Sequence, residues 1–130
     1  MEQLNLKFPK PRFADERRKK KLARAAANRE FQDRIKGLDG GLCQNPKCGN
    51  SWYWKMQVQA HHIQYVSDGG TNEDSNGITL CALCHRAAHR SRAWVLGLLQ
   101  ELKREHEAGR RKDFRWQPAI DNLKQKVGIE

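Results

Sequence analysis

Four cysteines and five histidines carry most of the chemistry that this chain of 130 residues offers. The cysteines form two close pairs, Cys43 with Cys48 and Cys81 with Cys84. Each pair can supply two of the four ligands of a tetrahedral ion. Two pairs of thiolates favour zinc in a closed structural site. The alternative is four buried cysteines without a ligand. We interpret the spacing as a structural zinc site, the kind of reinforcement that a small core needs.

A second group of polar residues consists of His61, His62, Asn76, His85 and His89. Four thiolates already complete a zinc tetrahedron, so the histidines need another role. His85 and His89 are four residues apart and share one face of a helix, whereas His61 and His62 are adjacent on a strand and point apart. One of the two can then face a metal while the other faces a substrate. Neutral imidazole serves both as a metal ligand and as a general base.

The elements that position these side chains follow from composition and periodicity. An extended arm over residues 1–13 precedes a helix over residues 15–36, which is rich in Ala, Lys, Arg and Glu and ends at Gly37. In the middle of the chain the sequence predicts a strand within residues 55–66, a loop over residues 67–75, and a turn and short strand over residues 76–80.

The second half of the chain is predicted to be helical. The helix runs from Cys81 through Leu102 to Gly109, with an apolar stripe that makes Trp94 a core residue. A short helix within residues 113–130 is anchored by Trp116. The aromatic residues at positions 52–54 are expected to pack in the core or against the zinc knuckle.

Positive charge is concentrated in the two flanks of the chain. Residues 1–36 hold 12 basic and 5 acidic residues, a charge of +7, whereas residues 37–89 carry −1 and residues 90–130 carry +4. Basic flanks point to a polyanion, by default nucleic acid, although a solvated surface is the alternative. The candidate phosphate contacts are Arg17, Arg18, Lys19, Lys20, Lys21, Arg86 and Arg90.

Taken together, the motifs resemble the HNH endonuclease family with its zinc-binding cysteines. The resemblance covers about residues 41–90 and comprises Cys-x4-Cys, His61-His62-Ile63, Asp68-Gly69-Gly70, Asn76-Gly-Ile-Thr-Leu80 and Cys81-x2-Cys84-His85-x3-His89. It implies an α+β fold: a ββα-metal (His-Me finger) core of two antiparallel strands and a helix, stapled by zinc and flanked by basic helices. Together with the charge and composition of the flanks, it leads us to expect a basic arm and helix (1–37), a nuclease domain with the zinc site (38–108) and a C-terminal extension (109–130).

The resemblance also implies a role for each residue. His62 matches the general base that activates water, and Asn76 matches the asparagine that holds the loop and helps to orient the base. His61, His85 and His89 match ligands of the catalytic ion. Mg²⁺, Mn²⁺, Ni²⁺ and Zn²⁺ all remain open as that ion, because histidine ligands tolerate each of them. The implied products are a 5′-phosphate and a 3′-hydroxyl.

Three functions follow as hypotheses. The first is a metal-dependent endonuclease that nicks or cuts double-stranded DNA, as in a phage, a mobile element or a defence system. The second is a zinc-stabilised DNA-binding module without catalysis, which leaves the histidines idle. The third is a nuclease subunit that needs a protein partner, such as a packaging or restriction component. No apolar stretch is long enough for a membrane span and none resembles a signal peptide, so we expect a cytoplasmic protein in a bacterial or phage-infected cell.

Overall fold

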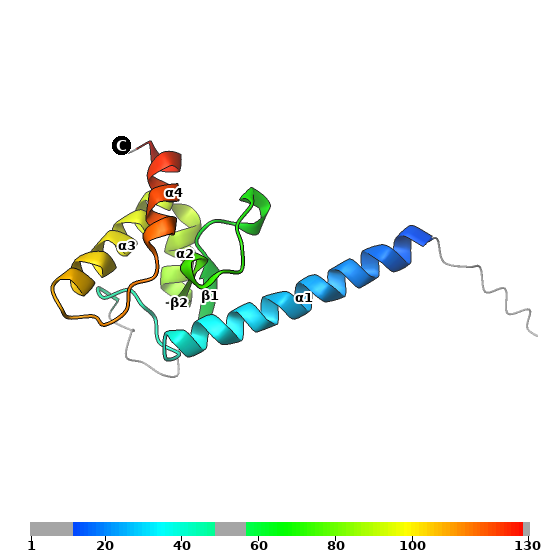
Figure 1. The fold of residues 1–130 in the computed structure, drawn as a ribbon, viewed down its shortest axis with the longest axis horizontal. Coiled ribbons are helices and arrows are strands. Elements are labelled where there is room, and N and C mark those ends of the chain that lie inside the picture. Colours follow the sequence, from blue (N-terminus) through cyan, green and yellow to red (C-terminus); the bar gives the residue numbers. More distant parts are fainter. Residues whose placement is uncertain (1–11, 49–56, 129–130) are drawn as a thin grey trace, which may run out of the picture.

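A computed structural model describes residues 12–48 and 57–128 of the chain. Its elements are α1 (Arg12–Leu38), β1 (Val58–His62), the 3-10 helices η1 (Val66–Asp68) and η2 (Asp74–Asn76), β2 (Gly77–Cys81), α2 (Ala82–Arg90), α3 (Arg92–Glu107) and α4 (Gln117–Val127). Helices α2, α3 and α4 gather around the two strands, and α1 extends far beyond them (Figure 1). The predicted α+β class is confirmed.

The sheet consists of β1 and β2, paired antiparallel with Ala60 opposite Thr79 and His62 opposite Gly77. At the middle of each outer edge, the backbone groups of the strand have partners outside the sheet. On the β1 edge, the amide group of Gln32 bonds both to the N–H of Ala60 at 2.9 Å and to its carbonyl at 2.7 Å. On the β2 edge, Thr79 donates its N–H to Asp39 and accepts from the N–H of Gln44. The backbone N–H and carbonyl groups of Ala60 and Thr79 therefore all have hydrogen-bond partners.

The main core lies on the far side of the sheet from α1 and collects side chains from β2, α2, α3 and α4. Leu99 and Trp116 are 0% exposed, and the cysteines of both pairs border the same cluster. Trp116 is therefore the anchor that the sequence predicted. Trp94 is only half-buried and packs against the edge of this core.

Helix α1 packs on the sheet through its last turns alone. Phe31 and Ile35 are 0% exposed and form a second small core with Ala60. The helix can approach closely because β2 begins with Gly77, where an added Cβ would lie 2.6 Å from the Ile35 side chain. Towards the N-terminus, residues 15–30 are all exposed, and the helix runs free of the core (Figure 1).

The sequence predicted helix α1 with boundaries that are too narrow. The helix begins at Arg12, so the last residues of the expected arm are helical, and residues 1–11 lie outside the described part. It continues through Gly37 to Leu38, because the stop signal is the pair Gly40 and Gly41. Both of these glycines adopt left-handed conformations, with φ of 65° and 71°, that few other residues tolerate.

Two further boundaries differ from the prediction. Strand β1 ends at His62 rather than Val66. Ile63 still donates its N–H to the carbonyl of Asn76, but the N–H of Asn76 bonds to Glu73 within η2, so the ladder stops there. The predicted helix from Cys81 to Gly109 is two helices. Ser91 leaves the helical conformation at φ −152° and ψ 117°, and its hydroxyl caps α3 by accepting from the N–H of Trp94. Positions 52–54 lie outside the described residues.

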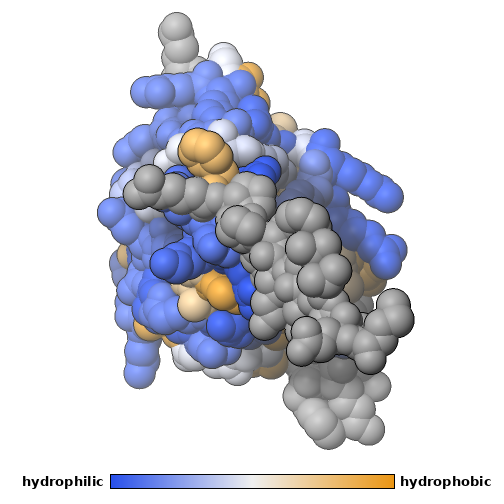
Figure 2. All heavy atoms as spheres, turned by 90° about the vertical axis from the view of Figure 1, so that its right-hand side faces the viewer, coloured by the Kyte–Doolittle hydropathy of each residue, from blue (hydrophilic) through white to orange (hydrophobic). Residues whose placement is uncertain are grey.

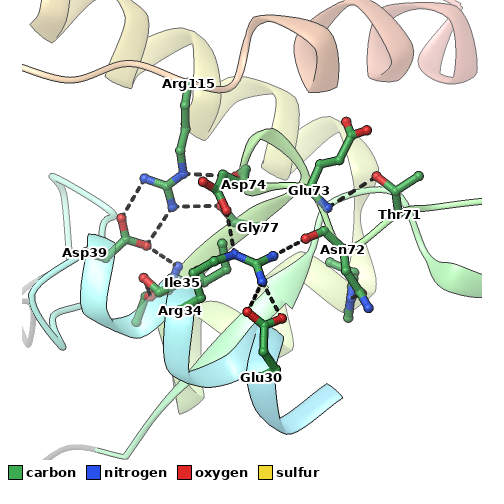
Figure 3. A network of polar contacts seen from close by, with 12 residues as sticks. Glu30, Arg34, Ile35, Asp39, Thr71, Asn72, Glu73, Asp74, Gly77 and Arg115 are labelled. Carbon is green, nitrogen blue, oxygen red and sulfur yellow. Dashed lines mark hydrogen bonds and ion pairs between the residues drawn. The ribbon is translucent and has the colours of Figure 1, made fainter. Parts of the chain in front are cut away.

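The segment after α3 is tied to the sheet by polar contacts (Figure 3). Arg115 pairs with the carboxylate of Asp39, whose side chain is 1% exposed, and donates to the carbonyls of Asp74 and Gly77. The indole of Trp116 donates to the same Gly77 carbonyl at 2.8 Å. The region predicted as a C-terminal extension therefore shares one core with the rest of the fold.

Hydrophilic side chains dominate the face towards which α1 projects, with only small separate apolar areas among the described atoms (Figure 2). Among the described helices, none is long and apolar enough to cross a membrane.

Candidate functional site

The four cysteines converge at the end of the sheet. Cys43 and Cys48 come from the loop after α1, Cys81 ends β2, and Cys84 lies in the first turn of α2. Their sulfur atoms all lie within 4.8 Å of one another, and Cys48 Sγ is 3.7 Å from Cys81 Sγ. A tetrahedral zinc with Zn–S bonds of 2.3 Å separates its sulfur ligands by about 3.8 Å. The donor set and its spacing therefore fit a zinc ion.

The pKa values of the buried thiols are consistent with a site that ionises only when a cation is bound. Burial raises the pKa of Cys43 to about 11 and also raises the pKa of Cys84 above its ordinary value. Burial opposes ionisation of Cys81 as well, but hydrogen bonds from the backbone of Cys84 and from neighbouring thiols lower its pKa overall. A group of buried thiolates needs a cation to offset its charge. Asn45 also donates to Cys84 Sγ at 3.4 Å, as an outer ligand contact would.

Three histidines form a second cluster, between the strand and helix α2. His61 from β1 and His85 and His89 from α2 each offer a ring nitrogen within 4.8 Å of the others. Nε2 of His85 and Nε2 of His89 are 3.1 Å apart. Ion-to-nitrogen bonds of about 2.1 Å place neighbouring nitrogens about 3.0–3.4 Å apart, so the three imidazoles fit one divalent ion.

Burial favours the neutral form, which is the form that binds metal, at two histidines of this cluster. Burial, together with the neighbouring imidazoles, lowers the pKa of His61 to about 3. The pKa of His85 is lowered by the same two causes, with burial the larger. Tyr65 stacks on His89, and its hydroxyl lies 3.4 Å from His89 Nδ1, which fixes the orientation of that ring.

His62 has different surroundings from its neighbour His61. Its ring lies flat on Phe31 of α1, with ring centroids 4.0 Å apart and an angle of 8° between the planes. Its Nε2 is 2.8 Å from Oδ1 of Asn72, in the loop before η2. Both adjacent histidines nevertheless line one cleft of about 220 Å³, together with Gln32, Tyr65, His85 and His89. The cleft thus joins three histidines that could bind one ion to a fourth imidazole held apart from them.

Asn76 does not touch His62. Its side chain is buried, accepts from the N–H of Gln64 at 2.7 Å, and donates to the carbonyls of Gln64 and Thr71. It therefore holds the loop between the strands in shape. The contact with His62 is made instead by Asn72, whose own carbonyl accepts from Arg34 of α1 (Figure 3). Arg34 is fixed in turn by Glu30 and Asp74.

Sequence reasoning missed three residues at this site, namely Phe31, Gln32 and Asn72. Phe31 and Gln32 belong to a helix whose hydrophobic residues are few, and nothing in their spacing indicates the strand that they meet. Asn72 lies in a polar loop where an asparagine is ordinary. One signal was available: Phe31 and Ile35 are four residues apart, which predicts a short apolar contact on one face of the helix.

The basic residues proposed as phosphate contacts are all exposed. The run from Arg17 to Lys21 lies on the part of α1 beyond the core, and Arg86 and Arg90 lie on α2. None of them belongs to either metal-binding cluster.

Two antiparallel strands followed by a helix, with three histidines between them and four cysteines at one end, define a small ββα unit with two metal-binding clusters. The HNH endonuclease family model matches residues 43–91, so this part of the chain is an HNH endonuclease domain. The comparisons with curated proteins and with solved structures gave no significant match. The HNH domain implies nuclease or DNA-binding activity and the use of a divalent metal.

Proposed function

We propose that the protein is a metal-dependent endonuclease that hydrolyses phosphodiester bonds in double-stranded DNA. The observation that carries this proposal is that His61 and His62, although adjacent in the chain, have different surroundings. His61 joins His85 and His89 in a set of ligands, while His62 is held separately at the wall of the same cleft. A binding module has no use for a fourth imidazole placed beside an ion site.

The three clustered histidines hold the divalent ion. When bound, the ion supplies positive charge that stabilises the scissile phosphate and the leaving 3′ oxygen. The chain contributes neutral ligands in a fixed geometry, since burial keeps a proton off His61 and Tyr65 orients His89. Mg²⁺, Mn²⁺, Ni²⁺ and Zn²⁺ are the candidates.

His62 acts as the general base. The carbonyl oxygen of the Asn72 side chain accepts a hydrogen bond from Nε2, so the proton resides on Nε2 and the lone pair on Nδ1. Nδ1 takes a proton from water as the water oxygen bonds to phosphorus. The bond from phosphorus to the 3′ oxygen breaks, and this oxygen leaves and gains a proton from solvent. The products are a 5′-phosphate and a 3′-hydroxyl.

Other residues act at a distance from the reacting atoms. Asn72 and Phe31 position His62, and Asn76 shapes the loop that carries Asn72. The four-cysteine cluster holds a structural zinc that fixes the start of α2 and hence His85 and His89. Arg86 and Arg90, with the basic flanks, supply affinity for the phosphate backbone without sequence information.

The test is a cleavage assay on supercoiled plasmid with Mg²⁺, Mn²⁺, Ni²⁺ or EDTA. His62→Ala is compared with wild type and with His106→Ala, a matched control because His106 lies on α3 and belongs to neither cluster. Wild type and His106→Ala should nick or linearise the plasmid in the presence of metal. His62→Ala should cleave at least about 100-fold more slowly, the usual contribution of a general base.

Zinc content and DNA affinity are measured on the same samples, and both should be unchanged in His62→Ala. Full cleavage by His62→Ala would refute the base assignment. If no protein cleaves although zinc and DNA binding are normal, the function is that of a binding module or of a subunit that needs a protein partner.

A further inference from the structure

Helix α1 presents two faces of different charge. The inner face is the side that carries Phe31 and Ile35, and helical periodicity places Arg17, Lys20 and Arg24 on it. Lys21 lies at its margin. Of the four acidic residues of α1, Asp15, Glu30 and Asp33 lie away from this face, and Glu16 lies at its other margin, four residues before Lys20. The centre of the inner face therefore carries basic residues alone among its charged residues, while the outer face mixes both signs.

The inner face is continuous with the wall of the cleft. Phe31 stacks on His62 and is itself 0% exposed, so this face of the helix is the one turned towards the proposed base. Phe31 is also the residue at which α1 leaves the core, since residues 15–30 are exposed, and His62 is the last residue of β1. With a rise of 1.5 Å per residue, Arg24 lies about 10 Å and Arg17 about 21 Å beyond Phe31 along the helix axis.

The spacing of these charges suits one strand of DNA. Arg17, Lys20 and Arg24 extend over about 10 Å, the length over which one strand of a duplex advances by about three nucleotides. Like charges three and four residues apart oppose helix formation when no counter-charge is present. Glu16, four residues before Lys20, is the one carboxylate of α1 that borders this row, so it offsets only part of the repulsion. A row of phosphates would supply the missing charge.

We propose that the inner face of α1 binds the backbone of duplex DNA next to the phosphate being cut, whereas the outer face stays in solvent. This inference rests on the proposed function, because it takes the cleft as the place of cleavage. It divides the basic run of α1 into two sets. Arg17, Lys20, Lys21 and Arg24 contact DNA. Arg29 does not, and neither do Arg18 and Lys19, although the sequence alone suggested both as phosphate contacts.

Two triple variants of identical composition test this division. The inner variant is Arg17→Gln, Lys20→Gln and Arg24→Gln, and the outer variant is Arg18→Gln, Lys19→Gln and Arg29→Gln. Each removes two arginines and one lysine, and all six residues are exposed, so folding should be equal in both. Circular dichroism, melting temperature and zinc content check this equality.

Binding to a fluorescent 30-bp duplex is measured without added divalent ion, over a range of NaCl concentrations. The inner variant should flatten the plot of log affinity against log salt by about 2–3 units, because about 0.9 unit is lost for each phosphate contact removed. The outer variant should change the slope by less than about 1 unit. Equal changes in both variants, or preferential inner-face binding to single-stranded DNA or RNA, would overturn the proposal.

Single-turnover cleavage gives a second readout. The inner variant should raise the protein concentration that gives half-maximal rate by about tenfold or more, with the maximal rate unchanged, since contacts remote from the reacting atoms contribute uniform binding. A lower maximal rate with unchanged half-saturation would contradict a binding role. If wild type binds with the predicted dependence on the inner face but does not cleave, the proposed function fails while this inference stands.

Discussion

At the scale of single residues, His61 and His62 show how the alternation of a strand gives two adjacent side chains different surroundings. Alternation along β1 predicts that the two side chains diverge, and they do. The sequence pattern therefore indicated two different roles. It did not indicate the partner of His62, because Asn72 lies ten residues away in a loop whose path depends on Asn76 and Arg34.

The two asparagines make a matched pair for mutation. Asn72→Ala should lower the maximal single-turnover rate by about 10–100-fold, with the half-saturating concentration and the melting temperature unchanged, because only the orientation of His62 is lost. Asn72→Asp should restore most of the rate, since a carboxylate also accepts from Nε2. A normal rate in Asn72→Ala would show that His62 needs no such partner.

Asn76→Ala should behave differently. It leaves buried backbone groups of Gln64 and Thr71 without partners, so the free energy of unfolding should fall by about 1–3 kcal/mol. Urea denaturation measures this loss. An Asn76→Ala protein as stable as wild type, but inactive, would return the orienting role to Asn76.

At the scale of elements, the contact between α1 and the sheet depends on the absence of a side chain at Gly77. Gly77→Ala should destabilise the fold by about 1–3 kcal/mol, because the new methyl group meets Ile35 and Phe31 at 2.6–2.8 Å in a packed interior. Gly97→Ala is the control. An added Cβ there meets nothing within 4 Å, and the site lies inside α3, so stability should rise by up to about 1 kcal/mol.

Urea midpoints of the two variants provide the measurement. Destabilisation of both to the same extent would mean that close packing at Gly77 is not what holds α1. The sequence predicted that this helix exists but not where it docks, since Phe31 and Ile35 make a weak apolar pattern. The break at Ser91 was also missed, although a serine three residues before Trp94 is a recognisable cap.

At the scale of the whole molecule, the cysteine cluster joins the loop after α1, strand β2 and helix α2. Because burial raises the pKa of Cys43 to about 11 and also raises that of Cys84, both are protonated thiols at neutral pH when no metal is present. Zinc binds thiolates, so its binding should release at least about two protons at pH 7. Adding zinc to protein that has been treated with a chelator should also restore a cooperative melting transition.

Calorimetry in buffers with different ionisation enthalpies counts the protons. Zinc binding without proton release would mean that the thiols are already ionised in the metal-free protein. Cysteine spacing alone predicted this cluster, because short Cys-x4-Cys and Cys-x2-Cys turns bring their sulfurs together in most local geometries. The contact of the segment before α4 with the sheet, through Arg115 and Asp39, could not be predicted, since these partners are 76 residues apart.

The covered edges of the sheet bear on how the protein behaves when it is concentrated. A strand pair with free backbone groups is a template for strand exchange and fibril growth. Gln32 masks one edge and Asp39 with Gln44 masks the other. A shortened chain that begins after Gln32 would expose β1, and we expect it to aggregate. A chain that begins just before Glu30 would keep this mask while losing most of the basic helix.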